Sequence, residues 1–229
     1  VPSLWTKKEL IKQYHLPPGK IEVTYEGADS KFKIENSKLK IKDILDKYQI
    51  KKPFVVYTGS LYPHKNIKRL IEAVKIINGR QELGLVIVCA RNVFFNRLKQ
   101  EVEQAGAEKY VNLAGFVPDE ELAVLYGQAR VFVFPSLIEG FGLPGLEAMA
   151  VGLPVVASNS SCLPEIYGEA ALYFDPYDIK EMARKIREVT GNKSTRNKLV
   201  QLGYEQVKKY SWRKMAWQTL KTYAGCFNV

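Results

Sequence analysis

The chain has 229 residues, of which 46% are hydrophobic and 25% are charged, proportions that are ordinary for a globular protein. No apolar run approaches the roughly 18 residues of a membrane-spanning helix, so the sequence predicts no helix that crosses a membrane. The net charge of +10 is compatible with an anionic ligand, a nucleic acid, an anionic membrane surface or simply a lysine-rich solvated surface.

The first 50 residues contain four recognisable segments. A helix is predicted over Leu4–Tyr14, a turn at Pro17–Gly19, a short apolar run at Ile21–Tyr25 and a lysine-rich amphipathic stretch at Leu39–Tyr48. The N-terminus lacks the basic leader and apolar core of a signal peptide, and the three cysteines have no metal-ligand spacing. We therefore expect a cytoplasmic protein, and peripheral attachment to the inner face of the membrane stays an open alternative.

The next region alternates short β-like runs with helical patterns. Six runs are rich in Val, Ile, Phe and Tyr and apolar on both faces, as in buried parallel strands: Phe54–Gly59, Gly84–Ala90, Val111–Phe116, Val131–Pro135, Pro154–Ser158 and Ala171–Phe174. Helices are predicted at Ile67–Ile77, Phe94–Ala105, Asp119–Tyr126, Gly145–Ala150 and Ile179–Val189, with Asp119 as an N-cap. Residues 193–225 indicate one or two further helices with a break at Ser211–Trp212.

This repeated order of strand and helix predicts an α/β fold, a Rossmann-like parallel sheet with helices on both faces. In such folds ligands bind beyond the carboxyl ends of the strands, beside the N-termini of helices. We therefore expect functional residues directly after strands.

The loop after the fourth predicted strand is the strongest candidate for a ligand site. Gly140 and Gly142 let the backbone turn tightly and approach a ligand closely, and Pro144 suits the first turn of a helix. The free amides and dipole at a helix start favour a phosphate group. Two acids, Glu139 and Glu147, bracket the loop and could accept hydrogen bonds from sugar or ribose hydroxyls. Glutamates at this spacing are also common by chance, so the loop alone does not decide the function.

Four ordered segments carry a resemblance to a known family. They are PSLIEGFGLPGLEAMAVGLPVVAS at residues 135–158, TGSLYPHKNI at 58–67, LAGFV at 113–117 and PEIYGEAALYFDP at 164–176. Together they resemble glycosyltransferase family 4, a group of retaining enzymes with the GT-B fold. The resemblance extends over essentially the whole chain, because Ser3, Lys20–Val23 and Gly27–Asp29 are similar to the stretch that leads into the donor-binding domain.

The resemblance implies a role for each matching residue. Glu139 would contact hydroxyls of the donor sugar, Glu147 the ribose hydroxyls, and Lys65 the diphosphate, so that Glu139 and Lys65 are the predicted catalytic pair. Further donor contacts are implied at the glycine turn and in the loop amides: Gly59, Ser60, Gly140, Phe141, Gly142 and Leu143. Phe116 and Val117 would meet the base through their backbone.

One position departs from the family pattern. Many members carry an arginine after the glycine of the first turn, where this chain has Ser60. Arg91 follows the second predicted strand and could take over that phosphate contact, or it could be a solvated arginine. The family is typically metal-independent, so we expect no metal and no cofactor, with the nucleotide sugar as co-substrate; a fixed ammonium and backbone dipoles would stabilise the leaving diphosphate.

The resemblance also predicts how the chain is divided. Residues 1–50 would be an interdomain connection, 51–191 the nucleotide-sugar-binding domain, and 192–229 helices that pack on an absent N-terminal domain. That domain would bind a glycan or lipid-linked acceptor, so the isolated chain is expected to bind a donor, of GDP-mannose or UDP-sugar type, without completing a transfer. Apolar surface meant for that domain could invite dimerisation.

Two other functions fit the sequence less well. A basic nucleic-acid-binding module would explain the charge, but the chain has no recognised reading motif and no concentrated basic stripe, so we expect no nucleic acid partner. A dinucleotide-dependent dehydrogenase is disfavoured, because the segment from Gly59 to His64 lacks the spaced glycines of a dinucleotide turn.

Overall fold

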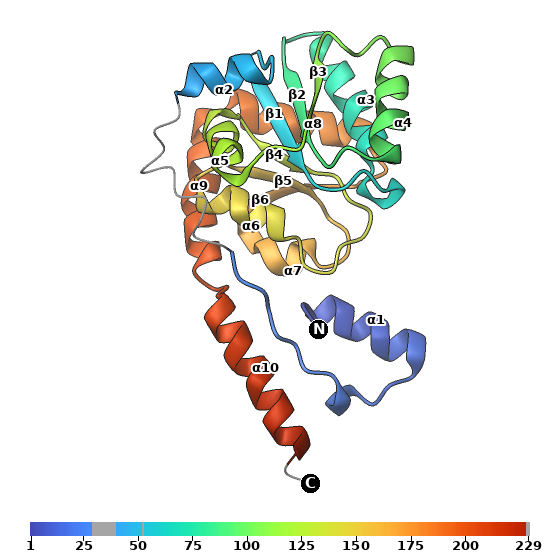
Figure 1. Cartoon of the computed structure of the whole chain (residues 1–229), viewed down its shortest axis with the longest axis vertical. Coiled ribbons are helices and arrows are strands. Elements are labelled where there is room, and N and C mark those ends of the chain that lie inside the picture. The colour runs from blue at the N-terminus through green and yellow to red at the C-terminus, as the bar shows by residue number, and fades with distance from the viewer. Residues whose placement is uncertain (29–39, 52, 228–229) are drawn as a thin grey trace.

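The computed structural model describes residues 1–28, 40–51 and 53–227. A body of sheet and helices forms most of the molecule, and helices α1 (Leu4–Tyr14) and α10 (Trp212–Phe227) lie together beyond one end of it (Figure 1). Leu39, where the lysine-rich stretch was predicted to begin, and Asp29 of the family pattern fall outside the described residues.

The centre of the body is a six-stranded parallel sheet in the order β3-β2-β1-β4-β5-β6. The strands are β1 (Phe54–Thr58), β2 (Gly84–Val88), β3 (Val111–Gly115), β4 (Phe132–Phe134), β5 (Val155–Ser158) and β6 (Ala171–Phe174). Each corresponds to a predicted run, shortened by one or two residues except β6, which matches throughout. The predicted Rossmann-like sheet is therefore confirmed.

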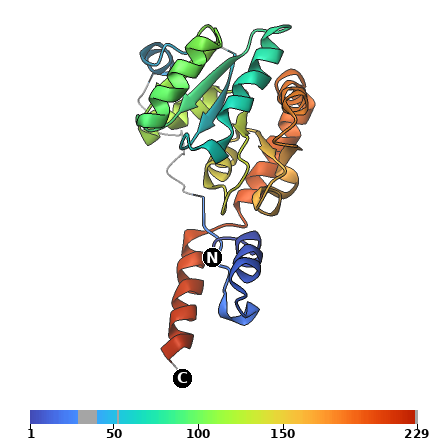
Figure 2. The ribbon, with the colours of Figure 1, turned by 90° about the vertical axis from the view of Figure 1, so that its right-hand side faces the viewer.

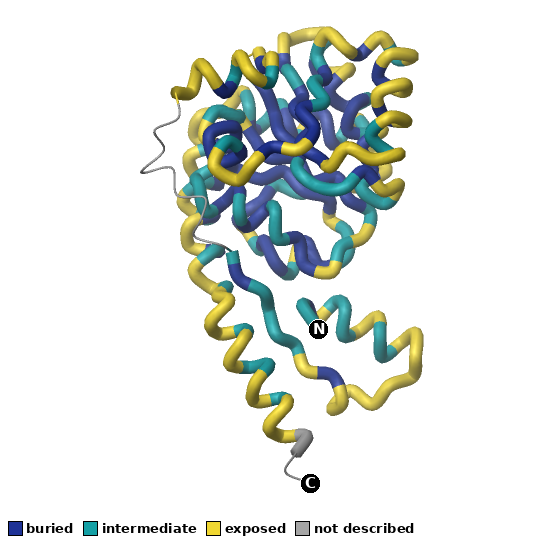
Figure 3. Tube along the Cα trace, viewed as in Figure 1, coloured by how far each residue is buried: buried dark blue, intermediate teal, exposed yellow. Residues whose placement is uncertain are grey.

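Helices cover both faces of this sheet (Figure 2). They are α2 (Ile41–Lys47), α3 (Ile67–Asn78), α4 (Val93–Gln104), α5 (Asp119–Gln128), α6 (Leu143–Ala150), α7 (Leu163–Tyr167), α8 (Ile179–Gly191) and α9 (Lys193–Val207). The strands are buried between the helices, which is why they are apolar on both faces (Figure 3). In β1, for example, residues from Phe54 to Tyr57 have no exposed surface.

Two local expectations need correction. Asp119 is the first helical residue of α5 and Pro118 occupies the N-cap position, because the extended backbone that a cap requires falls one residue earlier. Helix α7 was not predicted, because five residues with Pro164 in the first turn are too short to show an apolar stripe.

The C-terminal helices differ in how they pack. Gly203 of α9 lies against Met149 of α6, and the Gln206 amide donates a 2.6 Å hydrogen bond to the carbonyl of Ile166. Helix α9 is therefore part of the body. Helix α10 instead exposes Trp217, Leu220 and Tyr223, and Figure 3 shows it largely exposed along its length. The proposed division into 1–50, 51–191 and 192–229 remains a prediction.

Helix α6 packs so closely on α7 that one glycine cannot carry a side chain. A Cβ atom at Gly145 would lie 2.3 Å from the hydroxyl of Tyr167 and 2.4 Å from its ring, and Tyr167 is fully buried. Gly145→Ala should therefore lower the free energy of unfolding by about 1–3 kcal/mol, the usual cost of overpacking. Urea denaturation measures this change.

Gly191, the last residue of α8, is the matched control, because no atom lies within 4 Å of a Cβ built there. Gly191→Ala should leave the stability unchanged or raise it slightly, since alanine favours helix. Equal effects of the two substitutions would contradict the described packing of α6 on α7.

Candidate functional site

The order of the strands reverses between β1 and β4. The chain winds outward from β1 through β2 to β3, and then returns to place β4 on the other side of β1. The loops that follow β1 and β4 therefore separate in opposite directions at the carboxyl edge of the sheet. This topological switch point is where open α/β sheets bind their ligands.

The two loops are tied to each other by the backbone and by one asparagine. The Leu137 amide donates to the His64 carbonyl at 2.8 Å. The buried Asn66 amide donates to the carbonyl of Pro135 at 3.0 Å and to that of Pro176 at 2.9 Å. Asn66 therefore holds the ends of β4 and β6 against the turn that follows β1.

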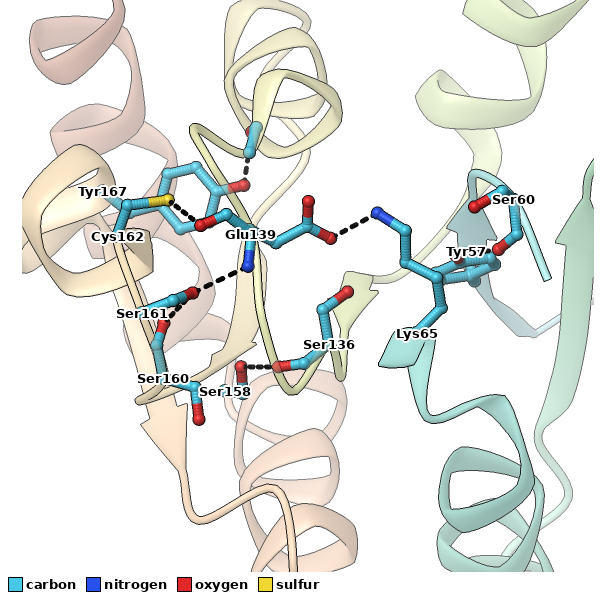
Figure 4. Close-up of polar contacts among 11 residues, drawn as sticks. Tyr57, Ser60, Lys65, Ser136, Glu139, Ser158, Ser160, Ser161, Cys162 and Tyr167 are labelled. Carbon is cyan, nitrogen blue, oxygen red and sulfur yellow. Dashed lines mark hydrogen bonds and ion pairs between the residues drawn. The ribbon is translucent and has the colours of Figure 1, made fainter. Parts of the chain in front are cut away.

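An ion pair crosses the switch point. Lys65, in the 3-10 turn Pro63–Lys65 after β1, places its Nζ 2.6 Å from Oε1 of Glu139 in the loop after β4 (Figure 4). The side chains are only 15% and 12% exposed, so water screens the pair weakly. The structure thus brings together the predicted catalytic pair from segments 74 residues apart.

The backbone of the Glu139 loop is held from the side of α7 (Figure 4). The Glu139 amide donates to Ser161 Oγ at 2.9 Å, and Cys162 Sγ donates to the Glu139 carbonyl at 3.2 Å. The Tyr167 hydroxyl donates to the Gly142 carbonyl at 2.5 Å. Gly142 itself has φ +97°, a left-handed conformation that favours glycine, and it is the N-cap of α6 as predicted for the helix start near Pro144.

Ser136 is a residue of this site that sequence reasoning did not single out. Its side chain is drawn between Glu139 and Lys65 in Figure 4. Within the described part of the chain its Oγ is buried and has no hydrogen-bond partner. A buried hydroxyl without a partner costs free energy, so Ser136 is an unsatisfied polar group at the carboxyl end of β4. The only sign of Ser136 in the sequence is its position in the family motif at residues 135–158. Many residues of that motif pack in the core, so the position alone does not indicate a ligand contact.

Glu147 lies on the second turn of α6, half-buried and close to Tyr126 of α5. Burial raises the pKa of Tyr126, and the negative charge of Glu147 raises it further, which places the carboxylate near that hydroxyl. Tyr126 is also beside Thr58, at the carboxyl end of β1. Glu147 therefore lies on the side of α6 that faces Tyr126.

The glycine turn after β1 is closed by a hydrogen bond from Tyr57. Gly59 has φ +152°, and a Cβ there would lie 2.8 Å from the hydroxyl of Tyr57. That hydroxyl donates to the Ser60 carbonyl at 2.6 Å, which fixes the turn ahead of Lys65. Leu143, the first residue of α6, is half-buried.

The predicted base-binding residues lie toward β3. Phe116 is 73% exposed, whereas the side chain of Val117 is buried, so Val117 can offer a ligand only backbone groups. Arg91 is exposed, with its guanidinium 5.9 Å from the centre of the Phe95 ring and its Nε beside Gly115. Phe116 and Arg91 both line a surface groove of about 680 Å³ with Tyr48.

The side chain of Phe141 packs in the interior of the protein. It is buried, with its ring centre 5.5 Å from that of Tyr210 and 6.4 Å from that of Tyr25. Gly140 and Phe141 can therefore offer a ligand only their backbone amides. The Phe141 ring itself packs between Tyr25 of the N-terminal segment and Tyr210, which precedes α10.

A search of the described residues finds no cluster of three or more His, Cys, Asp or Glu side chains that could hold a metal ion. A second cavity of about 680 Å³ lies at the amino ends of β1 and β2, away from the ion pair. It is lined by Lys51, Leu83 and Tyr110. In the described residues, every helix is too short or too polar to cross a membrane.

Comparison with known proteins identifies the family. The family model described as glycosyl transferases group 1 matches residues 40–206. The chain belongs to this family of glycosyltransferases. It is 35% identical over 224 residues to O-antigen chain mannosyltransferase B of Escherichia coli, covering 96% of this chain and 58% of that protein. It is 30% identical over 187 residues to O-antigen chain mannosyltransferase RfbU of Salmonella typhimurium, covering 82% and 49%.

Solved structures agree on the fold. A glycosyltransferase from Rickettsia africae superposes with a TM-score of 0.86 at 20% identity, covering 97% of this chain and 61% of that one. The C-terminal domain of LpcC, a group 1 protein from Francisella tularensis, superposes with a TM-score of 0.66 at 26% identity, covering 80% and 97%. The chain spans about half the length of the two curated mannosyltransferases described above, 58% of one and 49% of the other.

The ion pair of this glycosyltransferase domain should contribute to its stability. Lys65→Met would leave the Glu139 carboxylate partly buried without its partner, which should lower the free energy of unfolding by about 1–3 kcal/mol. Glu139→Gln should act in the same direction. In a double-mutant cycle followed by urea denaturation, the double variant should lose at least about 1 kcal/mol less than the sum of the single variants.

Lys47→Met is the control, because Lys47 also contacts a carboxylate, that of Glu121 at 2.8 Å, but is 52% exposed. Its effect should be much smaller than that of Lys65→Met. Additive effects of Lys65→Met and Glu139→Gln would show that the two side chains do not interact in solution.

Proposed function

We propose that this chain binds a nucleoside diphosphate sugar at the carboxyl ends of β1 and β4, as the donor half of a retaining glycosyltransferase. The diphosphate lies against Lys65 and the amides that precede α6, the sugar hydroxyls contact Glu139, and the ribose hydroxyls contact Glu147. The observation that carries this proposal is the Lys65–Glu139 pair at the switch point of the sheet.

The chemistry of the pair suits this ligand. A nucleoside diphosphate sugar offers a negative diphosphate next to a sugar that carries hydroxyl donors, so it can replace both halves of the ion pair at once. Lys65 then hydrogen-bonds phosphate oxygens, and Glu139 accepts from a sugar hydroxyl. Because both side chains are already held in place, little ordering entropy is lost on binding.

The same groups favour transfer. As the bond between the sugar and the diphosphate breaks, negative charge grows on the departing phosphate. The Lys65 ammonium and the N-terminal amides of α6 stabilise that charge from fixed positions. This arrangement accounts for the leaving group without a metal ion, and we propose that donor binding is metal-independent.

The names of the relatives suggest the substrates. Both curated relatives described above are O-antigen chain mannosyltransferases. GDP-mannose is therefore the proposed donor, and a growing glycan or a lipid-linked sugar is the proposed acceptor, bound with the help of a further domain. An acceptor of that kind would bring the protein to the inner face of a membrane. The exposed Phe116 and Arg91 border the proposed place of the base.

Donor binding can be measured as a shift in melting temperature. A panel of GDP-mannose, UDP-glucose, UDP-galactose, ADP-glucose and dTDP-rhamnose should contain one donor, expected to be GDP-mannose, that raises the melting temperature. At a concentration of about 100 times Kd the gain is about 2.7 kcal/mol, or about 5–10 °C for a chain of this length. Lys65→Ala and Glu147→Ala should abolish the shift, and EDTA should leave it unchanged.

Lys75→Ala is the matched lysine control, because Lys75 is exposed on α3 and lines the cavity at the amino ends of β1 and β2. It should retain the full shift. A normally folded wild-type chain that shows no shift with any donor of the panel would refute the proposed function. A shift that disappears with EDTA would refute only its metal independence.

A further inference from the structure

The loop that carries Glu139 is held from a second side, by the start of the N-terminal helix α1. Ser3, the N-cap of α1, donates from Oγ to the Gly140 carbonyl at 2.7 Å, and Thr6 Oγ1 donates to the same carbonyl at 3.3 Å. Ser3 is fully buried. The peptide next to Glu139 is therefore fixed by α1, while Cys162 and Tyr167 fix the loop from the side of α7.

The position of α1 is set in turn by Glu165 of α7. Its two carboxylate oxygens accept hydrogen bonds from the backbone amides of Leu4 at 2.7 Å and Trp5 at 2.9 Å. The first turn of a helix has amides without intrahelical partners and carries positive partial charge. Helix α1 has no acidic residue in its own first turn, so Glu165 supplies that negative charge from another part of the chain.

Glu165 also holds the strand-like segment that returns from α1. The Tyr25 hydroxyl donates to Glu165 Oε1 at 2.9 Å. Burial, and then the hydrogen bond to Glu165 and its charge, raise the pKa of Tyr25 to about 12. The Tyr25 ring also contacts Tyr210, and both rings lie beside Phe141 of the loop.

We propose that Glu165 is a positioning residue for the donor sugar, an inference that rests on the proposed function. Glu165 fixes the first turn of α1, the cap residue Ser3 of that turn fixes the Gly140 peptide, and that peptide places the adjacent Glu139 for the sugar hydroxyls. Lys65 and Glu147 are on other elements, the turn after β1 and helix α6. The end of the loop at Gly142, which offers its amides to the diphosphate, is held by the Tyr167 hydroxyl, a contact that does not involve Glu165. Loss of Glu165 therefore weakens recognition of the sugar and leaves recognition of the nucleoside diphosphate largely intact.

The test compares two ligands on one chain. Isothermal titration calorimetry of the 229-residue protein with GDP-mannose and with GDP gives the ratio of their affinities. If another donor of the panel gives the largest melting shift, that donor and its own nucleoside diphosphate are used. Glu165→Ala should weaken binding of the nucleotide sugar by about fivefold or more, a change of about 1 kcal/mol, and change binding of the nucleoside diphosphate less than about twofold.

Two further variants separate positioning from folding. Ser3→Ala breaks the link to Gly140 but keeps Glu165, and it should change the affinity ratio in the same direction. Glu165→Gln keeps an acceptor oxygen without the charge, and it should give an intermediate ratio. Asn192→Ala, the control, removes the N-cap of α9, where Asn192 accepts from the Thr195 amide at 3.1 Å, and it should leave the ratio unchanged.

The outcomes are distinct. Equal losses for both ligands in Glu165→Ala and Ser3→Ala would show a merely structural role and overturn the inference. Unchanged affinities for both ligands in these two variants would overturn it as well. Failure of the wild-type chain to bind any nucleotide sugar would instead overturn the proposed function.

Discussion

The ion pair between Lys65 and Glu139 is the interaction on which the proposed site depends. It joins the loops that diverge from β1 and β4, and it exists only because β4 returns to the opposite side of β1 from β2. The surrounding contacts all serve to hold these two loops: Asn66 fixes the first against the ends of β4 and β6, and Tyr167 fixes the second against α7. A ligand with a negative group beside a hydroxyl-rich ring can contact both residues of the pair: the negative group binds Lys65 and a hydroxyl binds Glu139.

The N-terminal segment near Tyr25 and the C-terminal segment near Tyr210 meet beside the loop that carries Glu139. A Cβ atom at Gly27 would lie 2.2 Å from the backbone nitrogen of Trp212, so the backbones of the two segments are in direct contact. Tyr25 and Tyr210 belong to these two segments, and the rings of both contact Phe141. Through Glu165 and Ser3, the placement of α1 reaches the carbonyl next to Glu139. The contacts of α1 with the body therefore include one beside the place where the donor sugar is proposed to bind.

The sheet could be predicted from the sequence because strands such as Phe54–Thr58 are apolar on both faces and are separated by helical patterns. The start of α6 was visible from Gly142 and Pro144, and the family resemblance pointed to Lys65 and Glu139 as donor contacts, but not to the ion pair between them. Contacts between distant segments carry no periodic signal: Ser3 and Gly140 are 137 residues apart, and Glu165 caps a helix that begins 161 residues earlier. For the same reason the sequence could not show that the Phe141 ring faces inward or that the Ser136 hydroxyl lacks a partner.

The most direct test of the central claim observes the Lys65 ammonium itself. Its ¹H–¹⁵N NMR signal can be assigned in ¹⁵N-lysine-labelled protein as the resonance lost in Lys65→Arg. On saturation with GDP-mannose this signal should move, because the ammonium exchanges the Glu139 carboxylate for the diphosphate, while the signals of exposed lysines such as Lys75 stay in place. Saturable binding of the nucleotide sugar with no change in the Lys65 signal would contradict the account.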